Sequence, residues 1–143
     1  MIKIRAHHLV CIPRFYSGGY DKKFADNMKK ICLQIRKDPD TEVKIIAGKP
    51  DCLCDKCPYL HNSKCIQSKK IGKWVIIQDK KIIKYLKIRP NKVYRARDIF
   101  NLSINKINNN NINKICKDCI FLKNCMKVNI NKSFQKDLNK KLK

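Results

Sequence analysis

Two groups of cysteines have the spacing of metal ligands. Each group is a CxxC pair followed by a third cysteine, after seven residues in the first group and after five in the second. The groups are Cys54, Cys57 and Cys65, and Cys116, Cys119 and Cys125. A CxxC pair brings two sulfurs within reach of one metal ion or cluster, and a third cysteine nearby can bind the same centre. Two such triplets in one chain predict that its chemistry is metal binding.

Each triplet is one ligand short, because zinc takes four ligands and a cubane iron–sulfur cluster usually takes four cysteines. The N-terminal stretch supplies candidates. On a helix, either His7 or His8 shares a face with Cys11, and a histidine–cysteine pair at that spacing can bind one metal. The alternative is a capped helix start with a buried Cys11 and a hydrogen-bonded histidine. Cys32 belongs to the apolar stripe of a predicted helix, so we interpret it as a core residue.

Two arrangements of the metal ligands are open. In one, a single cluster binds both CxxC pairs, which are Cys54 with Cys57 and Cys116 with Cys119. In the other, each triplet holds its own centre and takes a fourth ligand from His7, His8 or Cys11, or from outside the chain. We favour an iron–sulfur cluster, with [4Fe–4S] as the expected type, because cysteine dominates the ligand set. Zinc is the alternative, since the spacing permits both.

The net charge of +23 comes mostly from lysine, which lacks the planar fork with which arginine binds guanine and phosphate. We therefore expect no specific nucleic-acid binding. The chain has no run of 18 apolar residues, and charges interrupt its N-terminus, which predicts no membrane span and no signal peptide. A cytoplasmic location is expected, and in that reducing compartment cysteine triplets indicate metal sites rather than disulfides.

The periodicity predicts a small, mostly helical α+β domain that folds around the metal centre or centres. Strands are expected over 1–5 and 42–47, and helices over 21–37, 71–87 and 95–102. The cysteine-rich domain is expected to span residues 1–128, with an Asn-rich linker near 108–113. Residues 129–143 are predicted to be a basic tail, either a weakly amphipathic helix or disordered.

The chain resembles a small bacterial and archaeal family of unknown function. The resemblance extends over nearly the whole chain, and its motifs are Arg5-Ala6-His7-His8-Leu9-Val10-Cys11, Gly18-Gly19-Tyr20 with Phe24 and Asn27-Met28, Cys54-x-x-Cys57-Pro58, and Ile115-Cys116-x-x-Cys119 with Cys125. Members of that family are thought to be iron–sulfur-binding proteins. The resemblance implies that His7, His8, Cys11 and the two triplets belong to the site, and it leaves Cys32 and Cys52 outside.

Two classes of function follow from these expectations. The first is electron transfer or redox sensing by an iron–sulfur cluster, with a redox partner that the sequence does not identify. The second is a zinc-stabilised interaction or nucleic-acid-binding module, against which the small number of aromatic residues argues. An enzyme is a third class, and the sequence offers neither a phosphate-binding glycine loop nor paired glutamates for it.

Overall fold

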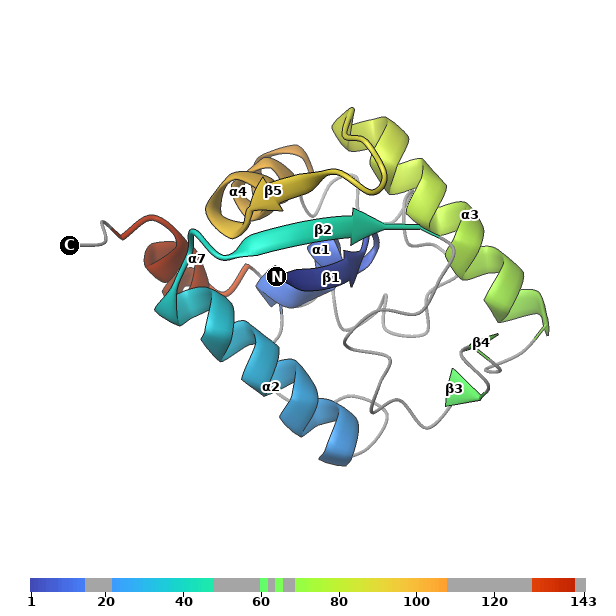
Figure 1. Cartoon of the computed structure of the whole chain (residues 1–143), viewed down its shortest axis with the longest axis horizontal. Helices are drawn as coiled ribbons and strands as arrows, with labels where there is room; N and C mark the ends of the chain where they lie inside the picture. The colour runs from blue at the N-terminus through green and yellow to red at the C-terminus, as the bar shows by residue number, and fades with distance from the viewer. Residues whose placement is uncertain (15–21, 48–59, 62–63, 66–68, 108–129, 141–143) are drawn as a thin grey trace.

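A three-stranded mixed sheet forms the centre of the computed structural model, which describes residues 1–14, 22–47, 60–61, 64–65, 69–107 and 130–140 (Figure 1). Strand β1 (Ile2–Arg5) pairs in parallel with β2 (Glu42–Ile46), and β5 (Val93–Arg95) pairs antiparallel with the other edge of β2. Because β1 and β2 are parallel, both end at the same edge of the sheet, with Arg5 opposite Ile46. Figure 1 shows both arrowheads pointing toward helix α3 (Lys69–Leu86).

Helices make up most of the described residues, so the α+β, mostly helical class predicted from the sequence is confirmed. Besides α3, they are α1 (His8–Cys11), the 3-10 helix η1 (Ile12–Arg14), α2 (Lys22–Lys37), α4 (Ala96–Lys106) and α7 (Lys132–Leu138). Strands β3 (Leu60–His61) and β4 (Lys64–Cys65) form a separate antiparallel pair. In the described part of the chain, no helix is both long and apolar enough to span a membrane.

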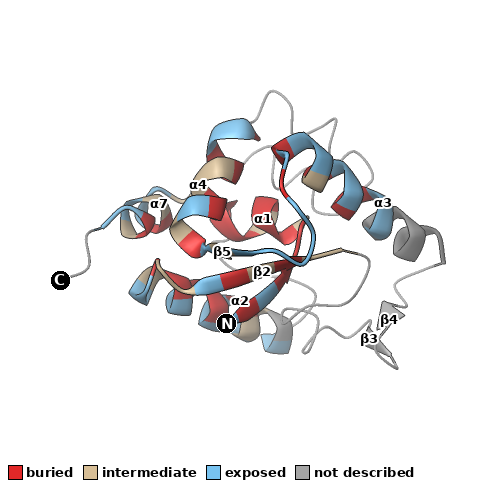
Figure 2. Cartoon of the chain, turned by 45° about the horizontal axis from the view of Figure 1, so that its top comes forward, coloured by how far each residue is buried: buried red, intermediate tan, exposed pale blue. Residues whose placement is uncertain are grey.

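The sheet buries one face. Ile4 and Ile45 have no exposed surface, whereas Lys3, on the opposite face, is exposed. This alternation follows from the two-residue repeat of a strand. Figure 2 shows the buried positions gathered where the sheet meets α1 and α4. The hydrophobic core therefore lies between one face of the sheet and the helices packed on it.

The described apolar residues on the stripe of α2 are buried, whereas on α3 Tyr85 departs from the helical repeat. On α2, Met28, Ile31 and Ile35 are buried, as is Cys32, which confirms the interpretation of Cys32 as a core residue. On α3, the helical repeat places Tyr85 on the same side as the buried Ile82 and Leu86, but Tyr85 is 45% exposed. Its hydroxyl donates a hydrogen bond to the Lys106 carbonyl at 3.2 Å, which is a polar partner that an inward position would not offer.

The basic segment at the C-terminus is a helix of the core. Asn131 caps α7, since its side chain accepts hydrogen bonds from two backbone amides of the first turn. Phe134 is 2% exposed and packs edge to face against Phe100 of α4, with ring centroids 5.7 Å apart. Leu138 is fully buried. Residues 130–140 therefore belong to the same packing unit as the sheet, and of the two forms expected for this segment the helical one is confirmed.

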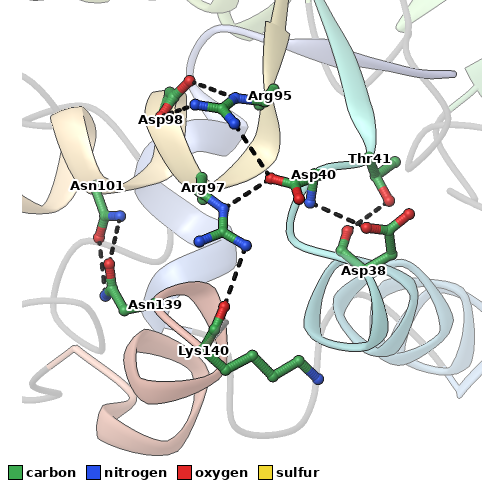
Figure 3. A network of polar contacts seen from close by, with 9 residues as sticks. All are labelled: Asp38, Asp40, Thr41, Arg95, Arg97, Asp98, Asn101, Asn139 and Lys140. Atoms are coloured by element: carbon green, nitrogen blue, oxygen red, sulfur yellow. Dashed lines mark hydrogen bonds and ion pairs between the residues drawn. The ribbon is translucent and has the colours of Figure 1, made fainter. Parts of the chain in front are cut away.

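Polar contacts join the start of α4 to the end of α7 and to the loop before β2 (Figure 3). Arg97 donates to the Asp40 carboxylate at 2.8 Å and to the Lys140 carbonyl at 3.1 Å. Asn101 and Asn139 are hydrogen-bonded through their side-chain amides at 3.0 Å. Most of these groups are exposed, so each contact adds little stability. The main stabilisation of α7 comes from the burial of Phe134 and Leu138, and the polar contacts help to fix its position.

We predict that Phe134→Ala lowers the free energy of unfolding by about 3–5 kcal/mol, because it removes a buried ring and leaves a cavity beside Phe100. Urea denaturation would measure the change. Lys136→Ala, on the exposed side of the same helix, is the matched control and should change stability by less than about 0.5 kcal/mol. Equal effects of the two substitutions would contradict the assignment of α7 to the core.

Candidate metal centre

A buried carboxylate organises the residues that follow β1. Asp79, in the middle of α3, is fully buried and accepts a hydrogen bond from Arg5 Nε to its Oδ2 at 2.9 Å. Its other oxygen, Oδ1, accepts the backbone N–H of His7 at 3.1 Å and lies 2.6 Å from His7 Nδ1. One side chain on α3 therefore fixes both the backbone and the imidazole of the turn between β1 and α1.

The contact with Asp79 sets the tautomer of His7. A carboxylate is an acceptor only, so the proton of a neutral imidazole lies on Nδ1 and its lone pair on Nε2. Burial lowers the pKa of His7 below 6.5, and the adjacent His8 lowers it further, against the hydrogen bond to Asp79, which raises it. His7 is accordingly neutral at pH 7, which is the form of histidine that binds metals.

His8 and Cys11 are the first and last residues of α1, which begins directly after His7. The ring of His8 packs against that of His7, with centroids 4.2 Å apart and planes inclined at 56°, and His8 is 8% exposed. Cys11 ends α1, one turn after His7, and is half-buried. The two histidines and Cys11, predicted as one group of candidate ligands, are thus close together.

The described ends of the chain on either side of the cysteine triplets meet at residues 5–14, which we call the N-terminal segment. The carbonyl of Ile46, just before residues 48–59, accepts the amide of Ala6 at 3.1 Å. The carbonyl of Ile107, just before residues 108–129, accepts a hydrogen bond from Arg14 at 2.9 Å. The amide of Asn131, after the same residues, donates to the Pro13 carbonyl at 2.8 Å. The described chain therefore enters or leaves both triplet regions beside His7 and Cys11.

Most predicted cysteine ligands lie outside the described residues. These are Cys54, Cys57, Cys116, Cys119 and Cys125. Cys65 is the last residue of β4, opposite Leu60 in the register of the β3–β4 pair. Among the described residues, no group of three or more His, Cys, Asp or Glu side chains could by itself hold a metal ion.

Sequence reasoning did not identify Asp79 as part of the site, although the sequence contains a signal. Asp79 is the single acidic residue between Asp55 and Asp98. It precedes Ile82 by three residues and Leu86 by seven, so it lies on the apolar stripe of α3, where a carboxylate needs a buried partner. That partner could not be found from the sequence alone, because Arg5 and His7 are more than 70 positions away from Asp79.

The chain was compared with protein-family models, with curated proteins and with solved structures. Residues 19–125 match a family model described as "Protein of unknown function (DUF1284)". This match includes both cysteine triplets. It begins after the N-terminal segment, so it does not include His7, His8 or Cys11. The curated proteins and the solved structures gave no match.

We predict that Asp79→Asn lowers the free energy of unfolding by about 3–5 kcal/mol, because the substitution leaves the charge of Arg5 buried without a counter-charge. Asp98→Asn is the matched control, since Asp98 pairs with Arg95 at a similar distance but both side chains are more than half exposed. That pair should contribute less than about 1 kcal/mol. Urea denaturation of both variants would test the difference, and equal losses would contradict it.

We also predict that Cys32 resists alkylation in the folded protein. Burial raises the pKa of its thiol from 9.0 to about 12, against a lowering effect of Arg36, so the reactive thiolate is scarce at pH 8. Iodoacetamide at that pH, followed by peptide mass mapping, should modify Cys32 about 1,000-fold more slowly in the folded chain than in urea. Similar rates in the two conditions would show that the thiol is accessible and ionised.

Proposed function

The chain belongs to the DUF1284 family, and we propose that it binds an iron–sulfur cluster through its two cysteine triplets and uses it for electron transfer or redox sensing. The observation that carries the proposal is the pair of CxxC motifs, each with a third cysteine: Cys54, Cys57 and Cys65, and Cys116, Cys119 and Cys125. Six cysteines in this spacing supply enough thiolates for a cubane cluster, which requires four ligands in all.

The geometry of the N-terminal segment supports this proposal. Backbone hydrogen bonds at Ala6 and Pro13, and one from the Arg14 guanidinium, hold described residues that flank the triplet regions. These contacts bring the chain before the first triplet, and the chain before and after the second triplet, to the N-terminal segment. A centre that takes ligands from distant parts of the sequence requires such a convergence. Two of these contacts are backbone hydrogen bonds, and the third is donated by the Arg14 side chain.

The predominance of cysteine in the donor set and the family resemblance favour iron–sulfur over zinc, whereas the cysteine spacing itself fits either. Thiolates are the standard ligands of iron–sulfur clusters, and the neutral imidazole of His7 is a nitrogen donor that such clusters also accept. When bound, a cluster supplies one-electron transfer. The protein's part is to hold the thiolates, to exclude water and to fix the hydrogen bonds and charges around the site.

We predict that the protein purified without oxygen carries about four iron and four sulfide per chain for one cluster, or about eight of each for two. It should also show a broad visible absorption that is lost in air. Counting iron, zinc and acid-labile sulfide, alongside the visible spectrum, is the measurement. Replacing Cys54 and Cys57, or Cys116 and Cys119, with alanine should remove most of the iron and sulfide.

Cys32→Ala is the matched control, because Cys32 is buried on α2 and belongs to neither triplet. It should retain the full iron and sulfide content. One or two zinc ions per chain with no sulfide and no colour would contradict the proposal. That result would favour the zinc-stabilised interaction module as the function of the fold.

A further inference from the structure

The outer side of α3 carries a row of exposed lysines. Its members follow one another at helical spacing over about 10 Å of the helix and of the residue after it. They are Lys80, Lys81, Lys84 and Lys87, which we call the α3 lysine row. The connection from α3 to β5 adds two more exposed basic residues, and no acidic residue lies between Lys80 and Lys92. This part of the surface therefore has a single sign of charge.

Described carboxylates do not offset the charge of the row. Asp79, which directly precedes it, is fully buried and is engaged by Arg5 and His7. Among the described residues, no carboxylate forms an ion pair with a lysine of the row. Lysines three and four positions apart on a helix repel one another. An anion bound along the row would relieve that repulsion.

The carboxylates of the described ion pairs on the surface lie elsewhere and are paired with arginines. Asp40 and Asp98 both lie beside Arg95, with nitrogen–oxygen distances of 3.6 and 3.0 Å (Figure 3). Asp137 of α7 pairs with Arg36 at 2.6 Å. Figure 1 shows α7 near the start of β2 and α3 beyond its end. These carboxylates are therefore at the opposite end of the sheet from the α3 lysine row.

The stability of the helix explains only part of the row. Cations in the last turn of a helix interact favourably with its dipole, which accounts for Lys84. Lys80 and Lys81 lie before that turn, where the effect has fallen off. Lys87 has a φ of 55°, a conformation that glycine adopts more readily than lysine. The concentration of lysine here therefore points to an anionic ligand.

An exposed aromatic ring borders the row. Tyr85 follows Lys81 by four positions and is 45% exposed, and its hydroxyl donates to the Lys106 carbonyl of α4 at 3.2 Å. This hydrogen bond orients the ring at the surface. Proteins that bind single-stranded nucleic acid combine positive charges along the backbone with aromatic rings on which bases stack. An acidic membrane or protein surface would be attracted by the lysines alone, so the ring favours a nucleic acid.

We propose that the α3 lysine row binds the phosphate backbone of single-stranded nucleic acid without sequence preference, with a base stacked on Tyr85. The row contains no arginine, which is the residue that reads guanine edges and clamps phosphate with two hydrogen bonds. Binding independent of sequence therefore agrees with the absence of specific recognition expected from the composition. The proposal uses only described surface residues and goes beyond the proposed redox function.

The test is fluorescence anisotropy of a labelled oligothymidine of about 20 nucleotides with the full-length, anaerobically purified protein. Four phosphate contacts predict that the logarithm of the binding constant falls with that of the salt concentration with a slope of about −3. The double variant Lys80→Gln/Lys84→Gln should bind about tenfold more weakly or worse and reduce the slope by about 1.4. Lys29→Gln/Lys30→Gln is the matched control, because it removes the same charge from exposed positions on α2. It should change affinity by less than about twofold.

Substitutions of Tyr85 test the stacked base. Tyr85→Ala should weaken binding of the oligothymidine about fivefold or more, whereas Tyr85→Phe keeps the ring and should retain the affinity. Unchanged affinity in Tyr85→Ala would overturn the assignment to a single strand.

Three other results would overturn the proposal as a whole. Equal losses in the two lysine double variants would show that attraction is spread over the whole surface. Absence of binding to the oligothymidine at about 50 mM salt would exclude a nucleic-acid ligand. Binding to phosphatidylserine vesicles without binding to the oligothymidine would assign the row to a membrane surface. None of these results would bear on the iron and sulfide content, so this proposal and the iron–sulfur function can fail separately.

Discussion

The ion pair between Arg5 and Asp79 is the constraint on which the arrangement of the candidate centre depends. It joins the end of β1 to the middle of α3, two elements separated by more than 70 residues, inside the core. A charge buried without its partner costs several kcal/mol, so the two residues can be accommodated only together. Their pairing fixes the edge of the sheet against α3, and His7 is positioned as a result. The position of a candidate ligand thus follows from the electrostatics of the core.

The sequence predicted the elements whose signals are local and periodic. The apolar stripe of α2 and the alternation of β2 each repeat over several residues, so the buried positions Ile35, Val43 and Ile45 could be assigned before the structure was known. β5 has only three residues and carries no such repeat. It is a strand because its neighbour β2 offers a free edge, and that is a property of the fold rather than of the segment. Tyr85 is another residue that periodicity assigns wrongly. The helical repeat predicts a buried side chain, but its hydroxyl donates a hydrogen bond to the Lys106 carbonyl and the residue is exposed.

The residues of the candidate site could likewise be predicted only where their signal is local in the sequence. Cysteine spacing is a local signal, so the triplets could be recognised from the sequence, as could the grouping of His7, His8 and Cys11 on one short helix. The partner of His7 could not, because no local rule connects the turn after β1 with α3, which lies more than 60 positions further along the chain. A rule about composition came nearest: a single carboxylate on the apolar stripe of a lysine-rich helix must find a buried cation or donor. The sequence does not tell which cation or donor is the partner of Asp79.

The N-terminal segment of ten residues is hydrogen-bonded to α4 and to the residue that follows it. Ser103 of α4 donates to the Leu9 carbonyl at 2.8 Å, and Arg14 donates to the carbonyls of Val10 and Ile107. The contacts to Leu9 and Val10 satisfy carbonyls that a short helix followed by Pro13 leaves without intrahelical partners. The same hydrogen bonds that complete the backbone of α1 and η1 therefore also set where the chain departs toward the second triplet. A sequence change that disturbed α1 would therefore affect both the stability of the core and the positions of Ile107 and Asn131, the described residues nearest the second triplet.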